Sequence, residues 1–200
     1  MTAFDVGLGG GECVLELADG RRLALPIDRW HGDADRADHV LLDACAGPTI
    51  DVGCGPGRLV AGLVGRGVVA LGVDNSPLAV ALTRARGGPA IRRDVFGRLP
   101  GVGRWAHVLL ADGNIGIGGD PVALLRRART LAHRGGTVLV EVEPPGCGRW
   151  RARARIGDGP WFPWARLDAP SLAATAREAG LGIVRLAERD GRWFAELTRS

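Results

Sequence analysis

The stretch TIDVGCGPGR, residues 49–58, decides the fold. Its first four residues are a short, mostly apolar run that predicts a buried strand, and residues 58–64 predict a helix with leucine and valine on one face. Between the two, Gly53, Gly55 and Gly57 stand at every second position. Glycines in a strand-to-helix turn let the backbone bend sharply and approach a ligand closely. The stretch therefore predicts a ligand-binding loop inside an α/β domain.

Strand and helix patterns alternate on either side of this loop. Further helices are expected from Ser76-Pro77 and from Asp120-Pro121 to Ala132, the latter ended by Gly135-Gly136, because Ser or Asp before Pro is a typical helix start. Alternation over this part of the chain predicts a parallel sheet with helices on both faces. The expected strands are residues 49–52, 68–73, 90–93, 107–110 and 137–142.

The flanking segments follow different patterns. Residues 13–17 and 22–27 predict a β-hairpin, residues 33–45 a helix, and residues 150–156 and 161–167 a second hairpin. A last helix at 171–179 precedes strands at 182–187 and 192–198, and this closing hairpin implies one antiparallel strand in the sheet. We expect a single domain over 1–200. It divides into a hairpin and cap helix at about 12–46, a core at about 48–143, and an insertion with C-terminal strands at about 147–199.

Composition limits the possible functions. The formal charge is +4, but all 26 basic residues are arginine, which we attribute to a GC-rich genome rather than to a nucleic-acid partner. The start of the chain lacks a signal-like segment and no run is long enough to span a bilayer, so we expect a cytoplasmic protein without a membrane partner. The four cysteines form no CxxC pair, so neither a metal site nor a disulfide is expected.

Asp74 ends the second expected strand, 21 positions after Gly53. A carboxylate at this place can accept hydrogen bonds from both ribose hydroxyls of an adenosine cofactor. NAD is one such cofactor, but its G-x-G-x-x-G pattern requires a third glycine where this chain has Arg58. The dinucleotide hypothesis is therefore disfavoured.

At these residues the chain resembles the class I S-adenosylmethionine (SAM)-dependent methyltransferases. Residues 51–57 resemble the first motif of that family, residues 71–76 the second, Asp94-Val95 the acidic position after the third strand, and residues 112–114 the loop after the fourth. The resemblance covers about 35–145. It implies a doubly wound, mostly parallel seven-stranded sheet, Rossmann-like, with a small N-terminal hairpin and a C-terminal antiparallel hairpin.

The resemblance also implies SAM as cofactor and a role for each matching residue. Gly53 and Gly55 pass close to the methionine portion, Asp51 helps to hold its amino group directly or through water, and Asp74 binds the ribose. Asp94 faces the adenine beside the Val95 backbone. A loop-orienting role for Asp51 and a solvated strand end for Asp94 are the alternatives. The full expected cofactor set is Asp51, Gly53, Cys54, Gly55, Asp74, Asn75, Asp94, Val95 and Asp112.

Three places are candidates for the acceptor side. His31 precedes the expected cap helix and has a pKa suited to a general base, with a capping role as the alternative. Asn114 lies in a glycine-rich loop and can orient the acceptor, or else contact the cofactor or form a turn. The aromatic stretch 161–164 can wall an acceptor pocket, or serve as the local core of its hairpin.

The leading hypothesis is methyl transfer to a small-molecule acceptor. The alternatives are a nucleic-acid methyltransferase or a SAM-binding module without catalysis. Residues 112–115 lack the Asn/Asp-Pro-Pro-aromatic pattern of amino-methylating DNA enzymes. The sequence names neither the acceptor nor the oligomeric state.

Overall fold

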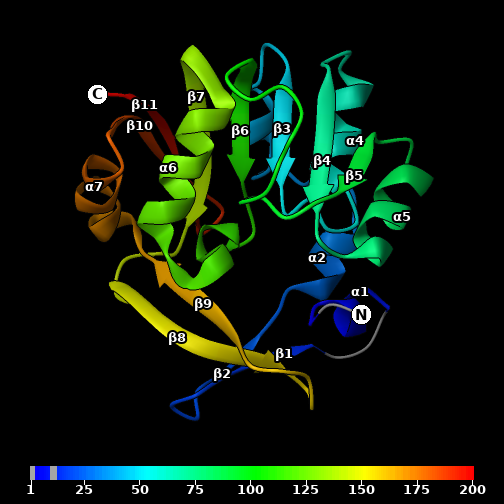
Figure 1. The fold of residues 1–200 in the computed structure, drawn as a ribbon, viewed down its shortest axis with the longest axis vertical. Helices are drawn as coiled ribbons and strands as arrows, with labels where there is room; N and C mark the ends of the chain where they lie inside the picture. Colours follow the sequence, from blue (N-terminus) through cyan, green and yellow to red (C-terminus); the bar gives the residue numbers. More distant parts are fainter. Residues whose placement is uncertain (1–2, 10–12) are drawn as a thin grey trace.

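The main sheet has seven strands and confirms the predicted doubly wound arrangement (Figure 1). The structure is a computed structural model that describes residues 3–9 and 13–200. Among the described strands of this sheet, β11 runs in the direction opposite to the other six. In spatial order the strands are β10 (Leu181–Arg189), β11 (Arg192–Arg199), β7 (Ala132–Val142), β6 (Trp105–Leu110), β3 (Thr49–Val52), β4 (Ala70–Asp74) and β5 (Ala90–Arg92).

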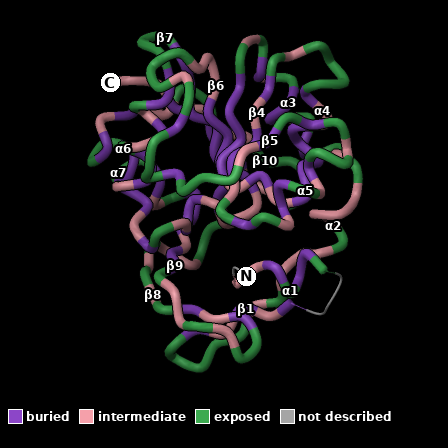
Figure 2. Tube along the Cα trace, turned by 45° about the vertical axis from the view of Figure 1, so that its right-hand side comes forward, coloured by how far each residue is buried: buried purple, intermediate pink, exposed green. Residues whose placement is uncertain are grey.

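Helices cover both faces of this sheet. Successive strand residues point to opposite faces, so Val108 and Leu110 of β6 pack into one core cluster and Leu109 into the other. The first cluster holds the apolar faces of α6 (Pro121–Leu131) and α7 (Ala169–Glu178). The second holds those of α3 (His39–Leu42), α4 (Arg58–Gly65) and α5 (Pro77–Ala85). Burial on both sides explains why the central strands are continuous apolar runs (Figure 2).

Three helices have side-chain caps, and two of these caps, Ser76 and Asp120, were predicted from the sequence. The Ser76 hydroxyl accepts from the Ala79 N–H at 3.0 Å, and Asp120 caps α6 through the Val122 and Ala123 N–H groups. Asp168 caps α7 in the same way. Side-chain caps of this kind satisfy backbone donors that have no partner within the helix.

A second, four-stranded antiparallel sheet faces the carboxyl ends of the main parallel strands (Figure 1). Its order is β2 (Arg22–Ala24), β1 (Val14–Leu17), β8 (Arg149–Ile156) and β9 (Phe162–Leu167). The two hairpins that the sequence predicts separately pair with each other through β1 and β8, with Leu15 opposite Ile156. Their apolar residues form a third core cluster, against which Phe4, Ile27 and Ile117 pack.

The predicted helix at 33–45 is wrong. Only α3 forms there, because the Asp35 and Asp38 side chains bind each other's backbone N–H groups, at 3.0 Å and 2.8 Å, and fix a turn that delays the start of the helix until after Asp38. The strand expected at 22–27 ends at Ala24, and α2 (Ile27–His31) follows it. A further short helix, α1 (Asp5–Leu8), is held near α5 by a hydrogen bond from the Ser76 hydroxyl to Asp5.

The predicted helix end at Gly135-Gly136 is also wrong, since α6 ends at Leu131 and β7 runs through both glycines. A Cβ on Gly136 would lie 2.8 Å from the Ala106 carbonyl oxygen. Glycine is needed there for close strand approach rather than for a helix end. None of the helices within the described ranges has the length and apolarity to cross a membrane.

Candidate functional site

The glycine loop after β3 makes a tight turn at the carboxyl edge of the sheet. Gly53, Gly55 and Gly57 all have positive φ values, of 74°, 52° and 86°. Gly57 is the N-cap of α4, and a Cβ on it would lie 2.6 Å from the Thr83 side chain. A Cβ on Gly55 would meet no protein atom within 4 Å. The loop thus needs glycine for its conformation and leaves free space beside Gly55.

Asp74 is held in place by this loop. One of its carboxylate oxygens accepts the Gly55 N–H at 3.1 Å and the other accepts the Ser76 N–H at 2.8 Å. Burial raises the pKa of the carboxyl, and these backbone hydrogen bonds oppose the rise. An ionised carboxylate has about four acceptor positions, so two remain for a ligand.

A cavity of about 520 Å³ lies between the loops at this edge and the second sheet. It brings together most of the residues expected to hold a cofactor. From that set it is lined by Gly53, Cys54, Gly55, Asp74, Asn75, Asp94, Val95 and Asp112. Asp51 is the one expected cofactor residue that is not part of the lining.

Asp51 lies on the face of β3 that α4 covers and is 3 % exposed. Burial raises the pKa of its carboxyl to about 7, although Arg58 opposes the rise. No hydrogen bond or ion pair from elsewhere in the described ranges reaches this carboxylate. A buried acid without a partner is poised to receive a cation or a hydrogen-bond donor from a ligand.

Asp94 and Val95 follow β5 at the far side of the cavity. One oxygen of Asp94 accepts the Phe96 N–H at 3.0 Å, and its side chain is exposed. The Val95 side chain is buried, and its carbonyl oxygen accepts a hydrogen bond from Arg127. The geometry leaves part of the Asp94 carboxylate available from the cavity.

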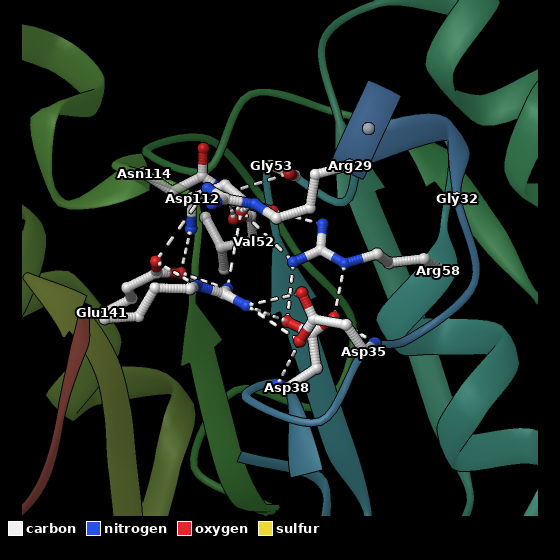
Figure 3. A network of polar contacts seen from close by, with 12 residues as sticks. Arg29, Gly32, Asp35, Asp38, Val52, Gly53, Arg58, Asp112, Asn114 and Glu141 are labelled. Atoms are coloured by element: carbon white, nitrogen blue, oxygen red, sulfur yellow. Dashed lines mark hydrogen bonds and ion pairs between the residues drawn. The ribbon is translucent and has the colours of Figure 1, made fainter. Parts of the chain in front are cut away.

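A network of charged residues lies beneath the glycine loop (Figure 3), and the sequence did not predict it. Its centre is Arg58, which is only 5 % exposed. Its guanidinium donates to both oxygens of Asp38, each at 2.7 Å, and also to Asp112. Burial alone would raise the pKa of Asp38, but the hydrogen bonds and charge of Arg58 bring it down to about 2.

Two further arginines complete this network. Arg192 of β11 binds both oxygens of Glu141, at 2.8 Å and 2.9 Å, and lies 2.9 Å from Asp38. Arg29 of α2 lies 2.9 Å from an oxygen of Asp112. The network therefore joins five segments that are distant in sequence, around residues 29–38, 58, 112, 141 and 192, and fixes the loop after β6 to the start of α4.

Asn114 lines the cavity, but its amide is already engaged. The side-chain amide donates to the carbonyl oxygens of Val52 and Gly53, both at 2.9 Å. Its carbonyl oxygen is the group left for a ligand. An acceptor-orienting role for Asn114 stays a prediction.

His31 is the last residue of α2 and is not part of the cavity lining, whereas its neighbour Trp30 is. The His31 Nε2 atom is buried and makes no hydrogen bond within the described ranges. Arg86 donates to the His31 backbone carbonyl. A general-base role for His31 stays a prediction.

The wall opposite the glycine loop is aromatic. Phe4, Phe162 and Trp164 have ring centroids 5.5 Å to 6.1 Å apart, and Trp30 lies 6.3 Å from Phe4. All four line the cavity. The predicted stretch 161–164 thus contributes Phe162, Pro163 and Trp164, while the Trp161 ring stacks on Arg155 instead.

The glycine-rich segment η1 (Asn114–Gly119) makes room for this wall. A Cβ on Gly116 would lie 2.2 Å from the Ala165 carbonyl oxygen, and one on Gly119 would lie 2.8 Å from Pro163. A Cβ on Gly118 would lie 2.7 Å from the Phe96 ring. The glycines therefore allow the second sheet to close tightly onto the main one.

No family model and no curated protein sequence matches the chain. Solved structures do. A SAM-dependent methyltransferase from Bacteroides fragilis, in complex with S-adenosyl-L-homocysteine (SAH), superposes with a TM-score of 0.82 at 18 % identity and covers 100 % of this chain and 97 % of its own. The CcbJ methyltransferase from Streptomyces caelestis superposes with a TM-score of 0.66 at 18 % identity, and the match covers 88 % of this chain and 91 % of that one. The 1,6-didemethyltoxoflavin-N1-methyltransferase from Burkholderia thailandensis superposes with a TM-score of 0.60 at 20 % identity, and the match covers 81 % of this chain and 74 % of that one. The chain has the fold of the SAM-dependent methyltransferases.

Proposed function

We propose that the chain binds SAM at the glycine loop and transfers its methyl group to a small-molecule acceptor. One observation carries the proposal: the fixed carboxylate of Asp74 and the open backbone at Gly55 line the same cavity. Asp74 can accept both ribose hydroxyls with its remaining acceptor positions. Asp51 lies behind the loop as an unpaired buried acid, which suits the amino group of the methionine portion.

The arrangement also suits methyl transfer, which depends on how the two reactants are positioned. When bound, SAM supplies an electrophilic methyl group whose S–CH₃ bond breaks as the acceptor's nucleophilic atom bonds to carbon. An acceptor that carries a proton on its nucleophilic atom would have to release that proton to a base or to solvent. The chain's part is to hold the two reactants in line and to exclude water, which can supply much of the rate acceleration. The second sheet, closed over the cavity, serves that exclusion.

The similar folds support a small-molecule acceptor. The Burkholderia structure holds 1,6-didemethyltoxoflavin together with SAH, and an O-methyltransferase from neocarzinostatin biosynthesis holds 1,4-dihydroxy-2-naphthoic acid. The cavity of about 520 Å³ is within the usual range for small-molecule sites. A nucleic-acid acceptor and a module without catalysis remain the alternatives, and a cytoplasmic location stays a prediction.

Calorimetry tests the cofactor assignment. The full chain should bind SAH at micromolar concentration and show no saturable heat with NADH. Clear binding of NADH without binding of SAH would overturn the proposal. Retention on heparin at physiological salt, with sub-micromolar affinity for DNA or RNA, would favour the nucleic-acid alternative.

The general base has its own test. With His31 as the base, His31→Ala should lower turnover by ~10²–10⁴ while SAH affinity stays within twofold. Unchanged turnover with an identified acceptor would leave catalysis to positioning alone.

A further inference from the structure

The described residues of 3–9, 13–30 and 160–164 that line the cavity form a wall that carries no charge. Every residue that these segments contribute to the lining is aromatic, or is Ala, Leu or Pro. The charged residues in the described lining come from the carboxyl edge of the main sheet, where the cofactor is proposed to bind: Arg58 begins α4, Asp74 ends β4, and Arg93, Asp94 and Asp112 follow β5 and β6. The cavity thus divides into a polar side and an apolar side.

The arginines of the second sheet do not compensate for this. Arg151 pairs with Asp120 at 2.7 Å and Arg155 with Glu16 at 2.9 Å. Arg149 pairs with Glu178 at 2.8 Å. None of these arginines lines the cavity. A charged group placed against the apolar side would lose its hydration without gaining a counter-charge.

The rings on this side also have a definite geometry. Phe4 is tilted by 52° against Phe162 and by 48° against Trp164, and Phe162 stands at 90° to Trp164. Rings in edge-to-face and tilted arrangements at 4.5–7 Å attract one another through their quadrupoles. A flat ring entering among them can meet one neighbour edge-on and another face-on, which a saturated ring cannot do.

We propose that the acceptor is an uncharged, planar aromatic molecule that packs against Phe4, Trp30, Phe162 and Trp164. The inference rests on the proposed function, because it assigns the rest of the cavity to SAM. Aliphatic and charged acceptors are the competing classes.

The test uses three probes of matched size: 2-naphthol, its saturated analogue decahydro-2-naphthol, and the anion 2-naphthoate. Each is titrated into the full chain by ligand-observed NMR, with and without saturating SAH. We expect 2-naphthol to bind at least fivefold more tightly than either of the others. Equal or tighter binding of decahydro-2-naphthol or of 2-naphthoate, or no binding of 2-naphthol in either state, would overturn the proposal.

Variants place the binding on this wall. Phe162→Leu should weaken 2-naphthol binding at least threefold, while Trp161→Leu, which changes the neighbouring ring outside the cavity, should leave it within 1.5-fold of the wild type. If Phe162→Leu does not fold, Phe4→Leu, which changes a ring outside the second sheet, should weaken 2-naphthol binding in the same way. An unchanged affinity in the folded variant would overturn the proposal. The proposed function is tested independently of this proposal. If calorimetry shows no binding of SAH, the proposed function is rejected, but titration of 2-naphthol into the chain without SAH still tests the acceptor class.

Discussion

The two sides of the cavity are built by different physical means. The carboxyl edge of the main sheet holds its ligand-facing groups by backbone hydrogen bonds and buried ion pairs, as at Asp74 and Arg58. The second sheet presents aromatic rings that pack against one another and against glycines of η1. Polar geometry fixes which atoms of a ligand are recognised, whereas an apolar wall selects shape and flatness. One side therefore suits an invariant cofactor, and the other can be altered to change the acceptor.

The largest expected effect concerns the polar side. Arg58→Met leaves Asp38 and Asp112 without their main buried partner, and breaking a buried ion pair typically lowers the free energy of unfolding by about 3–5 kcal/mol. Urea denaturation measures the loss. The control is Arg66→Met at the other end of α4, where the pair with Asp43 is exposed and should contribute at most about 1 kcal/mol. Equal losses in the two variants would show that the network does not hold this side together.

This network marks the limit of what the sequence predicts. The loop at 49–58 and Asp74 could be found because glycine spacing and a strand-end acid are local patterns. Arg58 was noticed only as a residue that a dinucleotide site would not carry. Its partners Asp38 and Asp112 lie 20 and 54 positions away, and no spacing rule connects them.

The second sheet shows the same limit. Both of its hairpins were predicted from turn signals, but their pairing joins Glu16 to Arg155 across 139 positions. The prediction of a helix at 33–45 was wrong for a local rather than a long-range reason. Its apolar spacing was helical, but the Asp35 and Asp38 side chains bind each other's backbone N–H groups, so the helix begins only after them and is short.

Cofactor affinity gives the next effect in size. Asp74→Asn removes the charge from a carboxylate that should accept two ribose hydroxyls, and charge-assisted hydrogen bonds contribute about 1.5–3 kcal/mol each. We expect SAH affinity to fall at least tenfold by calorimetry, with little change in the stability of the unliganded chain. Asp94→Asn is the matched comparison, and it should lower SAH affinity less than fivefold because that side chain is exposed. The reverse order would place the ribose at Asp94.

The pH dependence of binding sharpens the role of Asp51. Its carboxyl has a pKa of about 7 in the unliganded chain because of burial, so it is mostly protonated at pH 6 and mostly ionised at pH 8. Only the ionised form attracts the ammonium of SAH, so affinity should rise about tenfold across this range. Asp51→Asn should flatten the profile. A flat profile in the wild type would show that Asp51 orients the loop without meeting the ligand.

Stability should change in the opposite direction. The native pKa of Asp51 lies above the ordinary value of 3.8, so between about pH 4 and 7 the folded state binds more protons than the unfolded state. The contribution of this group to the free energy of unfolding therefore falls as pH rises through that window. Urea denaturation of the wild type against Asp51→Asn isolates the contribution, and a difference that grows toward low pH in favour of the wild type is the expected sign.

The smallest effect concerns the link between the two sides. Arg29 belongs to α2, whose Trp30 lines the aromatic side, yet its guanidinium binds Asp112 at the polar side, at 2.9 Å. Arg29→Gln should lower the free energy of unfolding by less than about 1 kcal/mol, because Arg29 is partly exposed and Asp112 keeps its contact with Arg58.

The consequence of this change should instead be local. Hydrogen exchange at the amides of 27–32 should quicken severalfold, and SAH should dissociate severalfold faster. Without Arg29, the long-range side-chain hydrogen bonds to this segment within the described ranges come from Arg86, which donates to the carbonyl oxygens of His31 and Gly32. Arg86→Gln is the control that loosens the same helix without touching the charged network. Faster exchange in both variants, with faster dissociation in both, would mean that α2 itself retains the ligand. Faster SAH dissociation in Arg29→Gln alone would assign the effect to Asp112. Unchanged hydrogen exchange in Arg29→Gln would show that aromatic packing, rather than this ion pair, holds the two sides of the cavity together.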